Sequence, residues 1–147
     1  MALPDLSELT ESDPPRYLRI VLPRWQDPVG YMVLPWLTEN RRGAWYTHEA
    51  TVRRWRLWAY TRAMNLRLPP PPDGRSRVVA ELRFARRRKR DPSNWSSTAK
   101  AAVDGLVDAG VFPGDDSRFV IGPDMREGVN VTKEQSELLI IHIWRQS

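Results

Sequence analysis

Hydrophobic and polar residues alternate along several stretches of the chain, which is the pattern of half-buried β-strands. Tyr17–Pro23 alternates and is rich in β-branched residues, so it predicts a strand. Ser76–Phe84 predicts a second strand, with a break in the alternation at its two adjacent valines. Ser117–Ile121 and Glu137–Trp144 are the remaining candidates, and the last of them is the most apolar. About four short strands are therefore expected.

A helical period replaces the alternation after the first strand. Apolar residues recur every three to four positions, and this stripe includes Trp55 and Trp58, which are therefore expected in the core. Thr47 or Thr51 is expected to cap this helix, which should run to about Asn65. The arginines of the segment lie mainly on the opposite side, so one face is predicted to be buried and the other basic.

A second helix is expected over Ala99–Asp108, with Thr98 as its cap and Gly110 as its stop. Residues 1–15 are polar and acidic and are interpreted as a flexible arm, so the folded domain is expected over residues 16–147. Two helices among about four strands predict a single α+β domain built on a small mixed β-sheet.

Composition narrows the class of protein. The chain has 147 residues, enough for one compact domain, and no cysteine, which excludes a disulfide scaffold, a thiolate zinc site and a cysteine nucleophile. Its apolar runs are too short to span a bilayer, and its N-terminus lacks the basic-then-apolar order of a secretory signal. We therefore expect a cytoplasmic protein without a membrane partner.

The two histidines do not suggest a zinc site. His142 alternates within the most apolar predicted strand, so we expect a structural residue whose hydrogen bonds are satisfied inside the protein. His48 lies near the predicted start of the first helix and is expected at the surface. Trp95 lies in a polar segment and is expected to pack against the core.

The net charge of +5 favours a polyanionic partner, and its distribution is more informative than its sum. Arg86–Arg90 is an unbroken basic run of the sequence RRRKR. Five like charges in a row repel one another unless an anion lies against them, so we interpret the run as a strip that follows nucleic-acid phosphates. Composition alone also permits an RNA-binding or ribosome-associated protein.

Acidic residues flank the second predicted helix. Asp91 directly follows the basic run, and the adjacent pair Asp115 and Asp116 comes after the helix. If the helix and its flanking turn folded back on themselves, these carboxylates would meet and provide the oxygen ligands that Mg²⁺ prefers. Aspartates in loops rich in glycine and proline are, however, more often helix caps and turn formers than metal ligands.

A family resemblance adds to this pattern. The order Asp91-Pro92-Ser93-Asn94, a helix reading Lys-Ala-x-x-Asp-x-Leu, and then Asp-Asp-Ser resembles the core motif of RusA-like Holliday-junction resolvases. Upstream, Leu37-Thr38-Glu39-Asn40-Arg41 with Trp45 is similar to the Asn-Arg-Trp entry of that family. The resemblance spans roughly residues 17–145 in the same order.

The resemblance implies a Mg²⁺-dependent homodimer, with Mn²⁺ as an alternative metal, that nicks opposed strands of a four-way DNA junction in recombination and repair. A bacterial host and a phage or prophage source would be typical of the family. By position, Asp91 and Asp116 match metal-site aspartates, Asp115 stands beside the second, and Lys100 matches a lysine that contacts the scissile phosphate. The basic strip is expected to hold the DNA; its members, with two more distant arginines, are Arg86, Arg87, Arg88, Lys89, Arg90, Arg41 and Arg53.

Ser93 departs from the family pattern, which has Asp-x-Asp-Asn where this chain has Asp-Pro-Ser-Asn. A neutral hydroxyl is a poor ligand for Mg²⁺, so metal binding should be weaker. The chain also has about three more residues between Asn94 and Lys100 than the family pattern. Three explanations stay open: an engineered change that traps substrate, a natural variant with another ligand such as Glu81, or a protein that binds junctions without cutting them.

Overall fold

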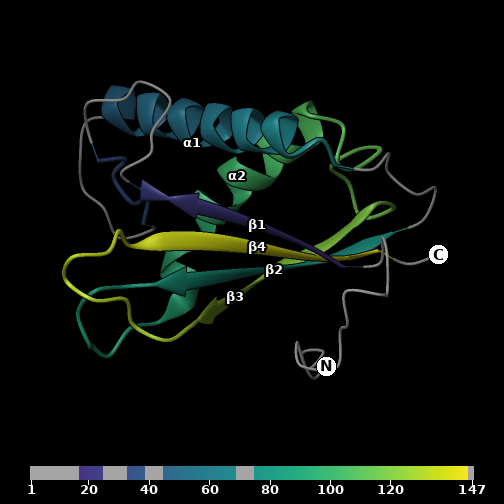
Figure 1. Ribbon diagram of the computed structural model, residues 1–147. Coiled ribbons are helices and arrows are strands. Elements are labelled where there is room, and N and C mark those ends of the chain that lie inside the picture. Colours follow the sequence, from purple (N-terminus) through teal and green to yellow (C-terminus); the bar gives the residue numbers. More distant parts are fainter. Residues whose placement is uncertain (1–16, 25–32, 39–44, 69–74, 146–147) are drawn as a thin grey trace.

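A four-stranded mixed β-sheet organises the computed structural model, which describes residues 17–24, 33–38, 45–68 and 75–145. The strand order is β1-β4-β2-β3 (Figure 1). β4 is antiparallel to both of its neighbours, whereas β2 and β3 are parallel. The strands are β1 (Tyr17–Pro23), β2 (Ser76–Arg83), β3 (Val120–Glu127) and β4 (Leu138–Arg145).

Two helices pack on one face of this sheet. α1 (Trp45–Leu66) lies along the top of Figure 1, and α2 (Ser96–Asp108) crosses beneath it. A short 3₁₀ helix, η3 (Pro92–Trp95), leads directly into α2. Because α2 connects the parallel strands β2 and β3, it begins near the end of β2 and ends near the start of β3.

The core lies between the helices and the sheet, as the hydrophobic pattern predicts. One side chain from each of three strands, Ile20, Val78 and Ile141, is completely buried against the helices. Trp55 and Trp58 of α1 pack into the same cluster, which confirms their predicted place. The α+β class is therefore the one expected from the sequence. No helix in the described ranges is long and apolar enough to cross a membrane.

The boundaries of α2 differ from the prediction at one end. The helix begins at Ser96, and its N-cap is Trp95, which makes no side-chain capping bond. Thr98, the predicted cap, is instead buried, and its hydroxyl bonds both the amide and the carbonyl of Leu37. At the other end Gly110 has φ of 81°, so the predicted glycine stop is confirmed.

The prediction of a third strand over Ser117–Ile121 is too early in the sequence. It runs over Val120–Glu127, because Asp116 forms a turn whose carbonyl accepts the amides of Phe119 and Val120. α1 also begins earlier than predicted, at Trp45.

Candidate nucleic-acid interface

The basic segment Arg86–Lys89 forms a loop after β2, and the aromatic ring of Phe84 lies at its base. Phe84 is buried, and its carbonyl accepts hydrogen bonds from the amide of Val131 at 3.0 Å and the side-chain amide of Asn130 at 2.9 Å. Asn130 also donates to the carbonyl of Arg86 at 3.2 Å. The segment after β3 therefore holds the start of the loop against the end of the sheet.

Arg90 closes the other end of the loop. Its guanidinium lies over the Phe84 ring, 4.0 Å from the centroid, and bonds the Glu127 carboxylate at 2.9 Å. The same guanidinium donates to the carbonyl of Arg86, also at 2.9 Å. Its side chain is only 9% exposed. Arg90 was predicted to touch DNA with its neighbours, but these contacts give it a positioning role within the loop.

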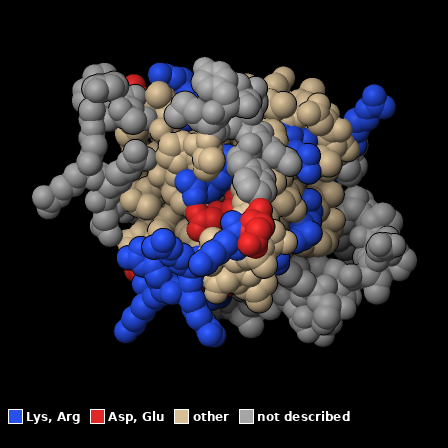
Figure 2. All heavy atoms as spheres, turned by 60° about the vertical axis from the view of Figure 1, so that its left-hand side comes forward, with Lys and Arg blue, Asp and Glu red and all other residues tan. Residues whose placement is uncertain are grey.

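The four residues between these anchors, Arg86, Arg87, Arg88 and Lys89, are all exposed. Within the described part of the chain, none of their side chains has a recorded ion pair or hydrogen bond. Figure 2 shows basic side chains gathered at this end of the molecule. The result is a small loop with a rigid base and four cations directed to solvent, which is a suitable surface for a chain of phosphates.

Asp91 lies immediately beside this loop and acts as the N-cap of η3. One carboxylate oxygen, Oδ1, accepts the Ser93 amide at 3.0 Å and the Ser93 hydroxyl at 2.8 Å. Asp91 is exposed, and its other oxygen has no recorded protein partner in the described ranges. Ser93 thus supports the turn formed by Asp91, which is the capping role that the sequence left open.

Asp115 and Asp116 lie at the opposite end of α2 from Asp91. α2 has 13 residues, so its ends are about 20 Å apart. The turn at Asp116 leads through Phe119, whose carbonyl bonds the amide of Ser76 at the start of β2. Asp91, in contrast, follows the end of β2. The expected folding-back does not occur, and one chain does not bring these carboxylates together.

The negative charge of the Asp116 carboxylate is already paired with the guanidinium of Arg118. Its two oxygens accept from the Arg118 side chain at 3.0 Å and 2.8 Å, and Oδ1 also accepts the Arg118 amide. The hydrogen bonds from the Arg118 side chain lower the pKa of Asp116 to about 2. A metal ion at Asp116 would therefore have to displace this guanidinium.

The described carboxylates of a single chain do not fit a shared metal ion. Among the described residues no group of three histidine or acidic side chains gathers within reach of one cation. Glu81, the alternative ligand, lies within β2, where its carboxylate bonds His142 at 2.9 Å and Arg83 at 2.5 Å. Both oxygens of Glu81 are thus occupied by protein partners.

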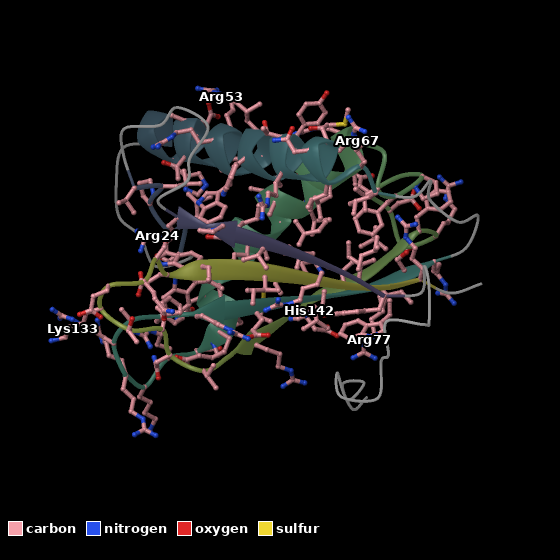
Figure 3. The ribbon with its side chains drawn as sticks, viewed as in Figure 1. Arg24, Arg53, Arg67, Arg77, Lys133 and His142 are labelled. Atoms are coloured by element: carbon pink, nitrogen blue, oxygen red, sulfur yellow. The ribbon has the colours of Figure 1, made fainter. Side chains whose placement is uncertain are left out.

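The remaining predicted site residues are dispersed. Lys100 lies near the start of α2, at the same end as Asp91, but its recorded partner is Asp104 at 3.5 Å. Arg53 lies on α1 at the top of Figure 3, far from the basic loop. Arg41 lies outside the described residues, as does the segment 39–44 of the proposed family entry.

Sequence reasoning missed the residues that shape the loop, Phe84, Glu127 and Asn130. Phe84 was assigned to a strand, and Glu127 and Asn130 come from a segment that is remote in sequence. The sequence offers no local signal for these residues, because their contacts join segments that are brought together only by the tertiary fold. Comparisons of the chain with protein-family models and with curated proteins find no match.

Proposed function

We propose that this protein binds the phosphate backbone of branched DNA through the basic loop Arg86–Lys89. The observation that carries the proposal is the arrangement of four exposed cations on a loop whose base is fixed by Arg90. Since the loop is already held in place, few backbone degrees of freedom need to be frozen when phosphates bind. The resemblance of residues 17–145 to RusA-like resolvases favours a four-way junction as the DNA partner and a homodimer as the binding species.

The direct test is binding of a fluorescent four-way junction in EDTA, with linear duplex and folded RNA as competitors. We expect tight binding without metal, and we expect that both competitors displace the junction only at a large excess. A protein with no affinity for any of the three nucleic acids would contradict the proposal. If the protein prefers the folded RNA to the junction, its partner is RNA and not DNA.

A second candidate function is metal-dependent cleavage of the junction, favoured by the exposed carboxylate of Asp91 directly beside the phosphate-binding loop. Because Asp91 and Asp116 lie at opposite ends of α2, such a site requires carboxylates from two copies of the chain. A two-fold dimer would place two such sites symmetrically, as paired nicking of a two-fold junction requires. Cleavage would then depend on dimer formation.

Complementation between inactive variants tests this second candidate. Asp91→Asn and Asp116→Asn should each abolish nicking in Mg²⁺ or Mn²⁺, whereas mixed dimers of the two should regain one intact site and nick one strand. Ser93→Asp, made in an otherwise wild-type chain, should increase nicking, because it adds a carboxylate beside Asp91. Junctions that stay uncut by wild type and by Ser93→Asp in both metals would leave the protein as a binder alone.

A further inference from the structure

The face of the sheet away from α1 and α2, here called the outer face, carries a cluster of three aromatic rings. Tyr17 of β1 and Trp144 of β4 are opposite each other in the strand pairing, with ring centroids 5.2 Å apart. His142 lies 5.9 Å from Tyr17 and 5.8 Å from Trp144. Figure 3 shows His142 on the side of the sheet opposite α1. His142 is buried, whereas Tyr17 and Trp144 are partly exposed.

A chain of hydrogen bonds holds these rings in position. The Tyr17 hydroxyl and His142 Nδ1 are 2.6 Å apart, and His142 Nε2 bonds the Glu81 carboxylate at 2.9 Å. Since a carboxylate only accepts, Nε2 of His142 donates to Glu81, and in the neutral ring Nδ1 accepts from Tyr17. Arg83 fixes the other oxygen of Glu81. The aromatic surface is therefore preorganised before any ligand arrives.

Cations surround the cluster on the same face. Arg19 is the strand partner of His142, and Arg126 is the strand partner of Glu81. Both arginines are exposed, and neither has a recorded ion pair in the described ranges. Arg83 and Arg77 also lie on this face, but they are balanced by Glu81 and by Asp124. The outer face thus keeps an excess of positive charge around the partly exposed rings of Tyr17 and Trp144.

Two buried donors in the cluster lack acceptors. Arg77 and Trp144 are opposite each other in the pairing of β2 with β4, and both the Arg77 Nε and the Trp144 Nε1 have no hydrogen-bond partner. Arg77 itself is 9% exposed. Both nitrogens are inaccessible to solvent, so a ligand would contact the partly exposed Trp144 ring and not these donors.

We propose that the outer face is a second DNA site, which takes an unpaired strand by stacking its bases on Tyr17 and Trp144. Its phosphates lie against the exposed Arg19 and Arg126. Aromatic rings with flanking cations are the combination that single strands require, since every base has a face to stack and every linkage a charge. The inference rests on the proposed function for the class of partner.

The test is binding of fluorescein-labelled dT20 and of a 20-base-pair duplex to the full chain. Trp144→Leu should weaken dT20 binding by about 5-fold or more, the effect of losing one stacked base, and should change duplex binding less than about 2-fold. The double variant Arg19→Ala/Arg126→Ala, at two exposed positions, should weaken dT20 binding and lower its salt dependence. If Trp144→Leu fails to fold, dT20 binding by Arg19→Ala/Arg126→Ala tests the outer face on its own.

The loop variant Arg87→Ala/Arg88→Ala separates this inference from the proposed function. If junction binding depends on the loop while dT20 binding is insensitive to Trp144, Arg19 and Arg126, the outer face is not a DNA site and the proposed function stands. If dT20 and junction both fail to bind the wild-type protein, both proposals are wrong. A third outcome is that the protein binds anionic vesicles, loses this binding in Arg19→Ala/Arg126→Ala, and does not bind dT20. The outer face would then bind a membrane surface and not an unpaired strand.

Discussion

Thr98 is a single residue that joins two distant parts of the chain. Its hydroxyl accepts the Leu37 amide at 2.9 Å and donates to the Leu37 carbonyl at 2.7 Å, and the two residues are 61 positions apart. Thr98 is completely buried, so water cannot replace these bonds. One side chain thereby satisfies both backbone groups of a loop residue that packs into the core.

Thr98→Val keeps the shape of this side chain but leaves both polar groups of Leu37 without a partner. We expect the free energy of unfolding to fall by about 1–3 kcal/mol, the cost of unsatisfied buried polar groups. Urea denaturation followed by tryptophan fluorescence measures this change. The matched control is Thr132→Val at an exposed position, which should alter stability by less than about 0.5 kcal/mol. Equal stabilities of the two variants would contradict the role given to Thr98.

Glu81 gives stability a pH dependence. The hydrogen bond from His142, and then the contact with Arg83, lower its pKa from 4.5 to about 2 despite partial burial. A carboxylate with a depressed pKa stabilises the fold above its unfolded pKa, and this contribution is lost as the pH falls toward its folded pKa. The stabilisation from Glu81 should therefore be complete near pH 6 and decline between about pH 5 and pH 2.

Glu81→Gln isolates this effect from the other carboxylates. We expect the variant to be less stable than wild type at pH 6, and the gap between the two should narrow progressively at pH 4 and pH 3. Urea unfolding at each pH measures the gap, and subtracting the two proteins removes the contribution of Asp116, whose pKa is also low. A gap that stays constant from pH 6 to pH 3 would mean that the pKa of Glu81 is not depressed.

The crossing of α1 and α2 depends on one glycine. A Cβ at Gly105 would lie 2.1 Å from the carbonyl oxygen of Arg56 and 3.1 Å from the Ala59 side chain. Any larger residue would therefore push the helices apart. Arg56 also bonds Asp108 at 2.5 Å and 2.8 Å, which ties α1 to the last turn of α2. The close contact at Gly105 and this ion pair together fix the position of α2 against α1.

Gly105→Ala should destabilise the protein although alanine is the better helix former. In an exposed helix the change would gain about 1 kcal/mol, but forcing an atom into a close backbone contact costs about 1–3 kcal/mol or more. We expect a net loss of about 1–2 kcal/mol in urea denaturation. Lys100→Ala, at an exposed position of the same helix, serves as control and should be nearly neutral. A more stable Gly105→Ala would show that the helices separate easily.

Elements with strong periodicity could be predicted from the sequence, whereas tertiary contacts could not. The strand at Tyr17–Pro23 and the end of α2 before Gly110 follow from local pattern alone. The continuation of the third strand through Asp124 was not predicted because a glycine and a proline precede that residue, and the pairing of this strand with β2 is a long-range property. The metal site was expected from three aspartates that flank one helix, but the sequence does not reveal whether the chain folds back to bring the two ends of that helix together.

At the scale of the whole molecule, two surfaces of the described residues carry groups of exposed positive charge, and their geometry differs. The basic loop projects cations from a fixed base at the end of β2, which suits the regular phosphates of a duplex arm. The outer face combines cations with aromatic rings, which suits unpaired bases. Branched DNA that carries an unpaired strand offers both features, so a protein that contacts a duplex arm and an unpaired strand together would prefer such DNA to linear duplex.

The most direct test of the central claim is the salt dependence of junction binding in EDTA. Each phosphate contact that is lost should reduce the slope of log affinity against log salt by about 0.9, so Arg87→Ala/Arg88→Ala should reduce it by about 1.8. The control is Arg67→Gly, which removes a charge just after α1; glycine tolerates the φ of 50° at this position. We predict that only the loop variant changes the slope. Equal slopes for the loop variant and wild type would show that Arg86–Lys89 does not hold the DNA.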